Sequence, residues 1–181
     1  MKNNIIRKEE NGMVSVVICL FAIMIFIILL YSNTIYNAYK STKVDVQDAL
    51  MSSTIAAVVI DLDEFDKYDV SVIDVDKAYE IFSTTMEGNM SHLLGNENVI
   101  SFRIEKLCVY NVYSSSDTRV YTYNTENGSY SMLSYDSYIQ LDGKQVVSST
   151  IYAEISFDLP GIFNSENIEQ HFNQSISFSS N

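Results

Sequence analysis

The densest group of side chains that could do chemistry lies between residues 61 and 76, where seven acids accompany one lysine. Carboxylate oxygens are the ligands that Ca²⁺ prefers, and Asp61, Asp63, Asp66 and Asp69 could supply four of them. The segment lacks the Asp-x-Asp-x-Asp-Gly order of an EF-hand loop, and a solvated acidic loop with a helix cap is the commoner explanation of such a composition. We therefore assign no metal site and keep the four carboxylates only as candidates.

Few other side chains in the sequence could take part in catalysis or metal binding. The two histidines, His92 and His171, stand in no HExxH motif and in no zinc-binding spacing. The two cysteines, Cys19 and Cys108, form no CxxC motif, and the chain has neither a Gly-rich phosphate loop nor a GxSxG elbow. We expect no catalytic residue and no cofactor, so the chain is predicted not to be an enzyme. A membrane-anchored hydrolase remains an alternative that no spacing favours.

An uncharged block of residues, 13–31, dominates the N-terminal part of the chain and reads MVSVVICLFAIMIFIILLY. As a helix it would be roughly 28 Å long, close to the hydrocarbon thickness of a bilayer. A cleaved secretory signal is the alternative, but its apolar core usually has about 7–15 residues and a small-x-small site follows it. The block is longer than that, and Tyr36-Asn37-Ala38 puts a bulky residue in the site. We predict an uncleaved transmembrane anchor.

Charge predicts the orientation of this anchor. Lys2, Arg7 and Lys8 precede the block, whereas Lys40 and Lys43 follow it. Because basic flanks stay on the cytoplasmic side, we expect a cytoplasmic lead at residues 1–12 and an extracellular C-terminal part, in a single-pass protein of the cell membrane. The net charge of −12 excludes nucleic acid as a partner, since phosphates require clustered Lys and Arg.

The segment after the anchor, residues 32–60, has the pattern of an amphipathic helix. It contains no Pro or Gly, and apolar residues recur at spacings of four and seven, at Ile35, Tyr39, Val46, Leu50 and Ala57. A single helix of more than forty residues would join it to the anchor. A membrane helix followed by a separate packing helix is the alternative.

A second helix is predicted from about residue 77 to 94. Asp74 or Asp76 would be its N-cap, and Gly95 would end it. Its apolar positions fall on one face, which we expect to be buried, and they are Ala78, Ile81, Phe82, Met86, Met90 and Leu93.

The rest of the chain changes to the period of β-strands. Residues 99–115 and 149–159 are rich in β-formers, and 170–180 could add a last short strand. Asn127-Gly128 and Asp142-Gly143 are hairpin signals, and Pro160-Gly161 breaks the strand before it. We predict an α+β domain over residues 61–181, with a short helix packed on four to six antiparallel strands. Its many tyrosines suit a sheet with one wet face, or else a sticky ligand-binding surface.

The N-terminal fifty residues resemble those of TadE/TadG-type pseudopilins, which belong to Tad (tight adherence, Flp) pilus systems. The resemblance lies in a short charged lead, a Gly, a membrane helix and an amphipathic continuation, as in RKEENGMVSVVICLF and the residues after it. The acidic linker, short helix and Tyr/Val-rich strands are similar to the extracytoplasmic domains of such proteins in Gram-positive bacteria. This resemblance implies a pilin-like fold. It also implies that the protein is a single-pass component of a Tad-type pilus or secretion apparatus, which would bind the bilayer and other membrane proteins of that system. The long helix could support homo- or hetero-oligomers.

The same resemblance implies a processing site. Gly12 would precede a prepilin-peptidase cut, and Met13 would be the new N-terminus. Many such pilins carry Glu as the fifth residue after the cut, where this chain has Val17. TadG-like members often lack this Glu. An uncleaved membrane protein fits Val17 equally well. The alternative function is a membrane-tethered extracellular binding or sensing module, with a cation site at the acidic residues 61–76.

Overall fold

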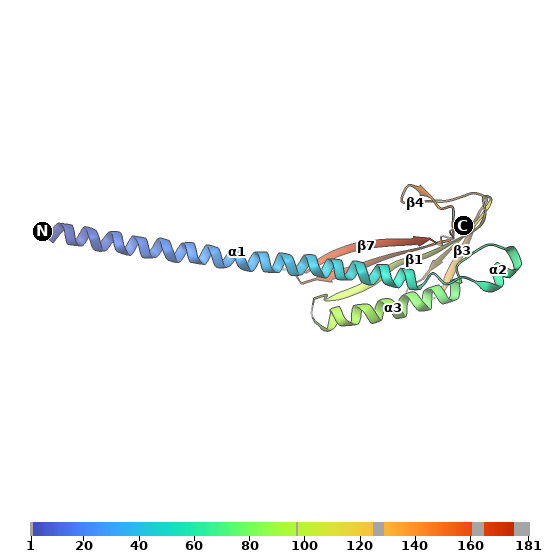
Figure 1. The fold of residues 1–181 in the computed structure, drawn as a ribbon, viewed down its shortest axis with the longest axis horizontal. Coiled ribbons are helices and arrows are strands. Elements are labelled where there is room, and N and C mark those ends of the chain that lie inside the picture. Colours follow the sequence, from blue (N-terminus) through green and yellow to red (C-terminus); the bar gives the residue numbers. More distant parts are fainter. Residues whose placement is uncertain (1, 97, 125–128, 161–164, 176–181) are drawn as a thin grey trace, which may run out of the picture. The chain divides into compact units, whose positions relative to one another are not determined.

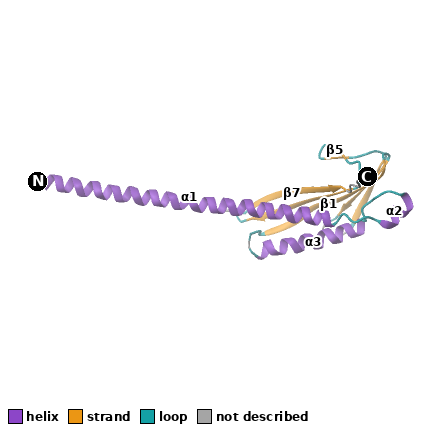
Figure 2. Cartoon of the chain, in the orientation of Figure 1, coloured by secondary structure: helices purple, strands orange, loops and turns teal. Residues whose placement is uncertain are grey.

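The computed structural model describes residues 2–96, 98–124, 129–160 and 165–175, with side chains from Met13 onward (Figure 1). The chain divides into two compact units, Met1–Ser41 and Thr42–Asn181. The first unit is helical. The second combines helices with a mostly antiparallel sheet, so the predicted α+β class is confirmed (Figure 2).

Helix α1 runs from Lys2 to Ala56 without a break, which confirms the single long helix. The helix ends at Ala56, four residues earlier than predicted. Just after its end, the Val58 N–H donates a hydrogen bond to the Ile55 carbonyl. Within the second unit, the predicted stripe residues Val46, Leu50 and Ala57 are fully buried. Thr42 and Ser53 complete that face, and the buried Ser53 hydroxyl donates to the Ala49 carbonyl at 2.7 Å. Small polar residues therefore belong to the packed face because their hydroxyls are satisfied within the helix.

The acidic segment is not the loop that the sequence predicted, because it contains helix α2 (Leu62–Tyr68). Asp61 is its N-cap, and its carboxylate accepts hydrogen bonds from the N–H groups of Asp63 and Glu64 at 3.0 and 3.1 Å. Asp69 ends the helix in a left-handed conformation with φ 53°. Acids in the first turn interact favourably with the helix dipole, so local capping explains much of the acidic composition.

Helix α3 extends from Val75 to Gly95 and confirms the second predicted helix. Asp74 is the N-cap, and its side chain accepts from the Lys77 N–H at 3.0 Å. Five of the six predicted stripe residues are buried, and Ile81 is half-buried. Asn89 of α3 donates to the Ser52 hydroxyl at 3.0 Å, which ties α3 to the C-terminal part of α1.

The main sheet has five strands in the order β3-β2-β1-β6-β7, and every adjacent pair is antiparallel. Its strands are β1 (Ser101–Ser114), β2 (Asp117–Tyr123), β3 (Tyr130–Tyr135), β6 (Thr150–Leu159) and β7 (Glu166–Ser175). Helix α3 packs against one face, where its Tyr79 ring stacks on Tyr123 of β2 at 5.2 Å between centroids. The central strands β1 and β6 carry most of the buried residues.

Strand β1 contains a bulge at Glu105, where its pairing with β6 shifts between Ile104 and Lys106. The apolar alternation in the sequence changes phase at the same place, from Ile104 to Leu107. The extra residue keeps both apolar runs on the face that packs against α3.

The opposite face of the sheet is partly covered, contrary to the single wet face that its tyrosines suggest. Strands β4 (Gln140–Leu141) and β5 (Lys144–Gln145) form a small hairpin, and Val146 after it packs in a cluster with Cys108, Tyr110, Val120 and Tyr152. The predicted Asp142-Gly143 turn joins the two strands, with φ values of 51° and 75°. These are the values that a two-residue hairpin of type I′ requires.

Three other predictions fall wholly or partly outside the described residues. Asn127-Gly128 lies outside them, although the flanking strands β2 and β3 do pair, with Tyr123 opposite Tyr130. The last strand, β7, begins at Glu166 rather than near residue 170, and its predicted end beyond Ser175 also lies outside. Gly161 lies outside as well, whereas Pro160 directly follows the end of β6.

Candidate functional site

The largest uncovered apolar surface in the described chain is the N-terminal part of α1. From Met13 to Tyr31 every side chain is exposed, and this is the one described segment long and apolar enough to cross a membrane. A helix satisfies its backbone groups internally, as a spanning segment must. Free Cys19 lies on this surface. The segment is compatible with a single-pass membrane anchor.

The acidic candidates are not gathered into a metal site. Asp61 uses its carboxylate to cap α2, and Asp63, Asp66 and Asp69 are exposed. Within the residues that the structure describes, no three His, Cys, Asp or Glu side chains form a group able to hold a metal ion. The geometry therefore gives Asp61 and Asp69 a role in starting and ending helix α2.

Glu64 of α2 takes part in the main polar contact between that helix and the sheet. The Tyr113 hydroxyl on β1 donates to the Glu64 carboxylate at 2.9 Å, and the Arg119 guanidinium lies 4.0 Å from the Tyr113 ring centre. Burial, and then the bond to Glu64, raise the pKa of Tyr113 far above its usual range. Its phenol thus remains a neutral hydrogen-bond donor, and the arrangement fastens α2 to the sheet.

The two histidines lie on different elements. His92 is in the last turn of α3, where a cation would suit the helix dipole. His171 of β7 stacks on the Tyr152 ring at 5.9 Å, and its Nε2 is 3.8 Å from the Asp142 carboxylate. Neither histidine is buried.

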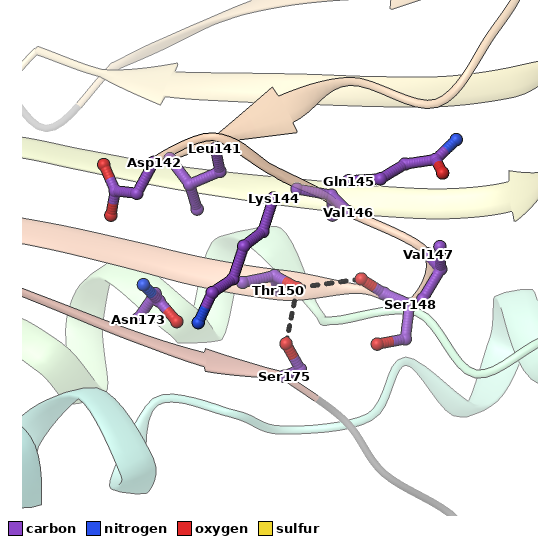
Figure 3. A pocket seen from close by; sticks show the side chains of 10 residues that line it. All are labelled: Leu141, Asp142, Lys144, Gln145, Val146, Val147, Ser148, Thr150, Asn173 and Ser175. Carbon is purple, nitrogen blue, oxygen red and sulfur yellow. Dashed lines mark hydrogen bonds between the residues drawn. The ribbon is translucent and has the colours of Figure 1, made fainter.

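A cavity of about 310 Å³ lies between the β4–β5 hairpin, the following loop and the ends of β6 and β7 (Figure 3). The Thr150 hydroxyl donates to the Ser148 carbonyl at 2.8 Å and is 2.8 Å from the Ser175 hydroxyl. These polar groups in the cavity wall are therefore hydrogen-bonded to one another. The lining is mostly polar and comprises Leu141, Asp142, Lys144, Gln145, Val146, Val147, Ser148, Thr150, Asn173 and Ser175. Such a cavity could hold water or a small polar molecule.

Gly12 and Met13, the candidate processing site, both lie within α1. The Met13 side chain is exposed. The contact between Tyr113 and Glu64 and the cavity beside Thr150 escaped the sequence analysis. Each joins residues more than twenty positions apart, and no motif marks them.

In comparisons with known proteins, no family model, curated protein or solved structure matches this chain. The class that the fold defines is an α+β domain that follows a long, apolar N-terminal helix.

Proposed function

We propose that this chain is a single-pass membrane protein of the TadE/TadG pseudopilin type, which serves a Tad-type pilus or secretion apparatus through assembly and partner binding. The observation that carries the proposal is the two-part character of α1. Its residues 13–31 are exposed and uncharged, whereas its later residues Val46 and Leu50, together with Ala57 directly after its end, form part of the core of an α+β unit. A pilin-like subunit requires one helix that serves both purposes.

In this proposal the anchor holds the protein in the bilayer and packs against apolar helices of partner proteins. Lipid tails are as apolar as leucine, so such packing depends on close fit between helices rather than on hydrophobic burial. The excess of Lys and Arg before the anchor supports an orientation with the N-terminus in the cytoplasm and the sheet outside. The chain is not an enzyme in this proposal, and its surfaces act by binding.

A second candidate function is a membrane-tethered extracellular binding or sensing module. The polar cavity beside Thr150 favours it, because ligand sites are concave and place a few polar groups along their walls. A cation at residues 61–76 gains no support from the described side chains, since Asp61 is engaged as a cap.

The experiment that tests the leading proposal is the intact mass and N-terminal sequence of the protein isolated from membranes of its native host. We expect a chain that begins at Met13, and a Gly12→Leu variant that still begins at Met1. Gly88→Leu is the matched control, because Gly88 has no atom within 4 Å of an added Cβ, and it should be processed normally.

Co-purification separates the two candidates. A pseudopilin should be recovered with the ATPase and platform proteins of the pilus system after mild crosslinking. Recovery of a chain that begins at Met1, without those proteins, would reject the pilus proposal and favour the tethered binding module.

A further inference from the structure

Strand β3 (Tyr130–Tyr135) forms one edge of the five-stranded sheet, and β7 forms the other. We propose that the outer edge of β3 pairs antiparallel with β3 of a second copy of this chain, so that one sheet continues across two molecules. The inference concerns the unit Thr42–Asn181 and does not depend on the proposed pilus function.

The hydrogen-bond pattern shows which backbone groups of β3 point away from β2. The Asn124 N–H donates to the Ser129 carbonyl at 2.8 Å, which makes that pair a hydrogen-bonded one. Hydrogen-bonded and non-hydrogen-bonded pairs alternate along an antiparallel ladder. Ser131, Leu133 and Tyr135 therefore bond to β2, and the N–H and C=O groups of the residues between them point outward.

The two edges of the sheet differ in how they are protected. Natural edge strands usually carry charges, proline or a bulge that discourages pairing with another chain. Strand β7 carries Glu166, Glu169 and His171. Strand β3 reads YSMLSY, has no charge or proline, and pairs with β2 in a regular register. Only β3 thus presents an edge that another strand could join without burying a charge.

The side chains of β3 are also uncovered on both faces. All six residues are exposed, and Met132 and Leu133, which point to opposite faces, are 51% and 58% exposed. On β2, Val120 opposite Leu133 is buried, and Tyr121 opposite Met132 is half-buried. An added strand would cover apolar area on both faces, which is favourable.

The order of side-chain sizes along β3 favours a second copy of the same strand. In a symmetric dimer, a two-fold axis between the two copies would pass beside Met132. The outward N–H and C=O groups of the two β3 strands then face each other and can form hydrogen bonds, as antiparallel pairing requires. Tyr130 then lies opposite Ser134 of the other copy, and Ser131 lies opposite Leu133. Away from the axis, each large side chain meets a small one on the same face, and at the axis Met132 meets its own copy. Although each chain carries a net charge of −12, no acid opposes another within the paired strands.

Disulfide trapping tests the pairing on the full chain in detergent, with the exposed Cys19 replaced by Ala. In the proposed register the two copies of Met132 face each other at about 5.5 Å between Cα atoms, within the range that a disulfide spans. Met132→Cys should therefore form a two-chain species under mild oxidation, at least roughly tenfold faster than Asn173→Cys, an exposed control on β7 whose thiols would meet only by diffusion.

Mixing variants that each carry one added cysteine, in addition to the buried Cys108, tests the register. Tyr130→Cys should crosslink with Ser134→Cys faster than either crosslinks with itself, because like positions would be four residues, or roughly 13 Å, apart. Equal rates for Met132→Cys and Asn173→Cys would overturn the proposal, since β3 would then have no preferred partner. Preferential crosslinks between Met132→Cys and Asn173→Cys would also overturn it, in favour of head-to-tail pairing of β3 with β7.

Discussion

The side-chain amide of Asn111 on β1 makes two hydrogen bonds to the backbone of Ile73. The Ile73 N–H donates to Asn111 Oδ1 at 2.9 Å, and Asn111 Nδ2 donates to the Ile73 carbonyl at 2.8 Å. Asn111 is 2% exposed and Ile73 is fully buried. The amide therefore makes the two hydrogen bonds that the backbone of a paired strand would make, and it holds the segment between α2 and α3 against the sheet. The site is buried, so water cannot replace these hydrogen bonds.

Loss of this amide should strongly destabilise the second unit. Asn111→Ala leaves the N–H and the carbonyl of Ile73 buried without partners, and we expect a loss of about 3 kcal/mol in the free energy of unfolding. Urea unfolding of the full chain in detergent, followed by far-UV circular dichroism, measures it. Asn167→Ala is the matched control, because its exposed amide bonds only to Asp158, and it should change stability by less than about 0.5 kcal/mol. Equal effects of the two substitutions would contradict this role.

The packed face of α1 makes a second prediction. Leu50 is fully buried, and Leu50→Ala should lower the free energy of unfolding by about 2–5 kcal/mol because it removes apolar contacts and leaves a cavity. Leu62, which is 71% exposed on α2, provides the same chemical change at the surface, and Leu62→Ala should cost less than about 0.5 kcal/mol. The same urea experiment compares them. If Leu50→Ala were as mild as Leu62→Ala, the C-terminal part of α1 would not belong to the core.

Two glycines should respond in opposite directions to the same substitution. Gly143 has φ 75°, so Gly143→Ala forces a side chain into the left-handed region and should cost about 1 kcal/mol. Gly88 lies inside α3 with no atom within 4 Å of an added Cβ, so Gly88→Ala should stabilise by about 0.5–1 kcal/mol. Thermal unfolding of both variants checks the signs. A stabilising Gly143→Ala would mean that the hairpin turn differs from the structure.

Tyr110 predicts a loss of stability at alkaline pH. Burial against the β4–β5 hairpin is the main reason that its pKa is raised from 10.0 to about 12. Above pH 10 the unfolded chain releases the phenolic proton while the folded chain keeps it, so stability should fall between about pH 10 and 12 and be unaffected by this group below that range. The expected contribution is about 2–3 kcal/mol.

Comparison of the parent with Tyr110→Phe isolates this effect. The variant should lose less stability than the parent between pH 10 and 12, and the difference between them should be constant from pH 7 to 9. Urea unfolding at each pH provides the measurement. Parallel curves across the alkaline range would show that Tyr110 ionises equally easily in both states.

Local patterns predicted the two long helices and one turn of this protein well. The uncharged block and the stripe through Val46 and Leu50 predicted α1, and the cap at Asp74 with its apolar periodicity predicted α3. Asp142-Gly143 predicted a hairpin. Each of these features depends on interactions between residues a few positions apart, so a single sequence contains the information that is needed.

The tertiary structure decided the features that depend on distant residues. Short α2 escaped prediction because its charges are typical of a solvated loop, and its contact with Tyr113 comes from a strand far along the chain. The pairing of β1 with β6, the bonding of Asn111 to Ile73 and the exposure of β3 at the edge depend on strand order, which loop closure and packing select together. The sequence by itself determined an apolar helix joined to an α+β unit. Only the assembled sheet decided which polar groups are buried in pairs and which strand edge is open to a partner.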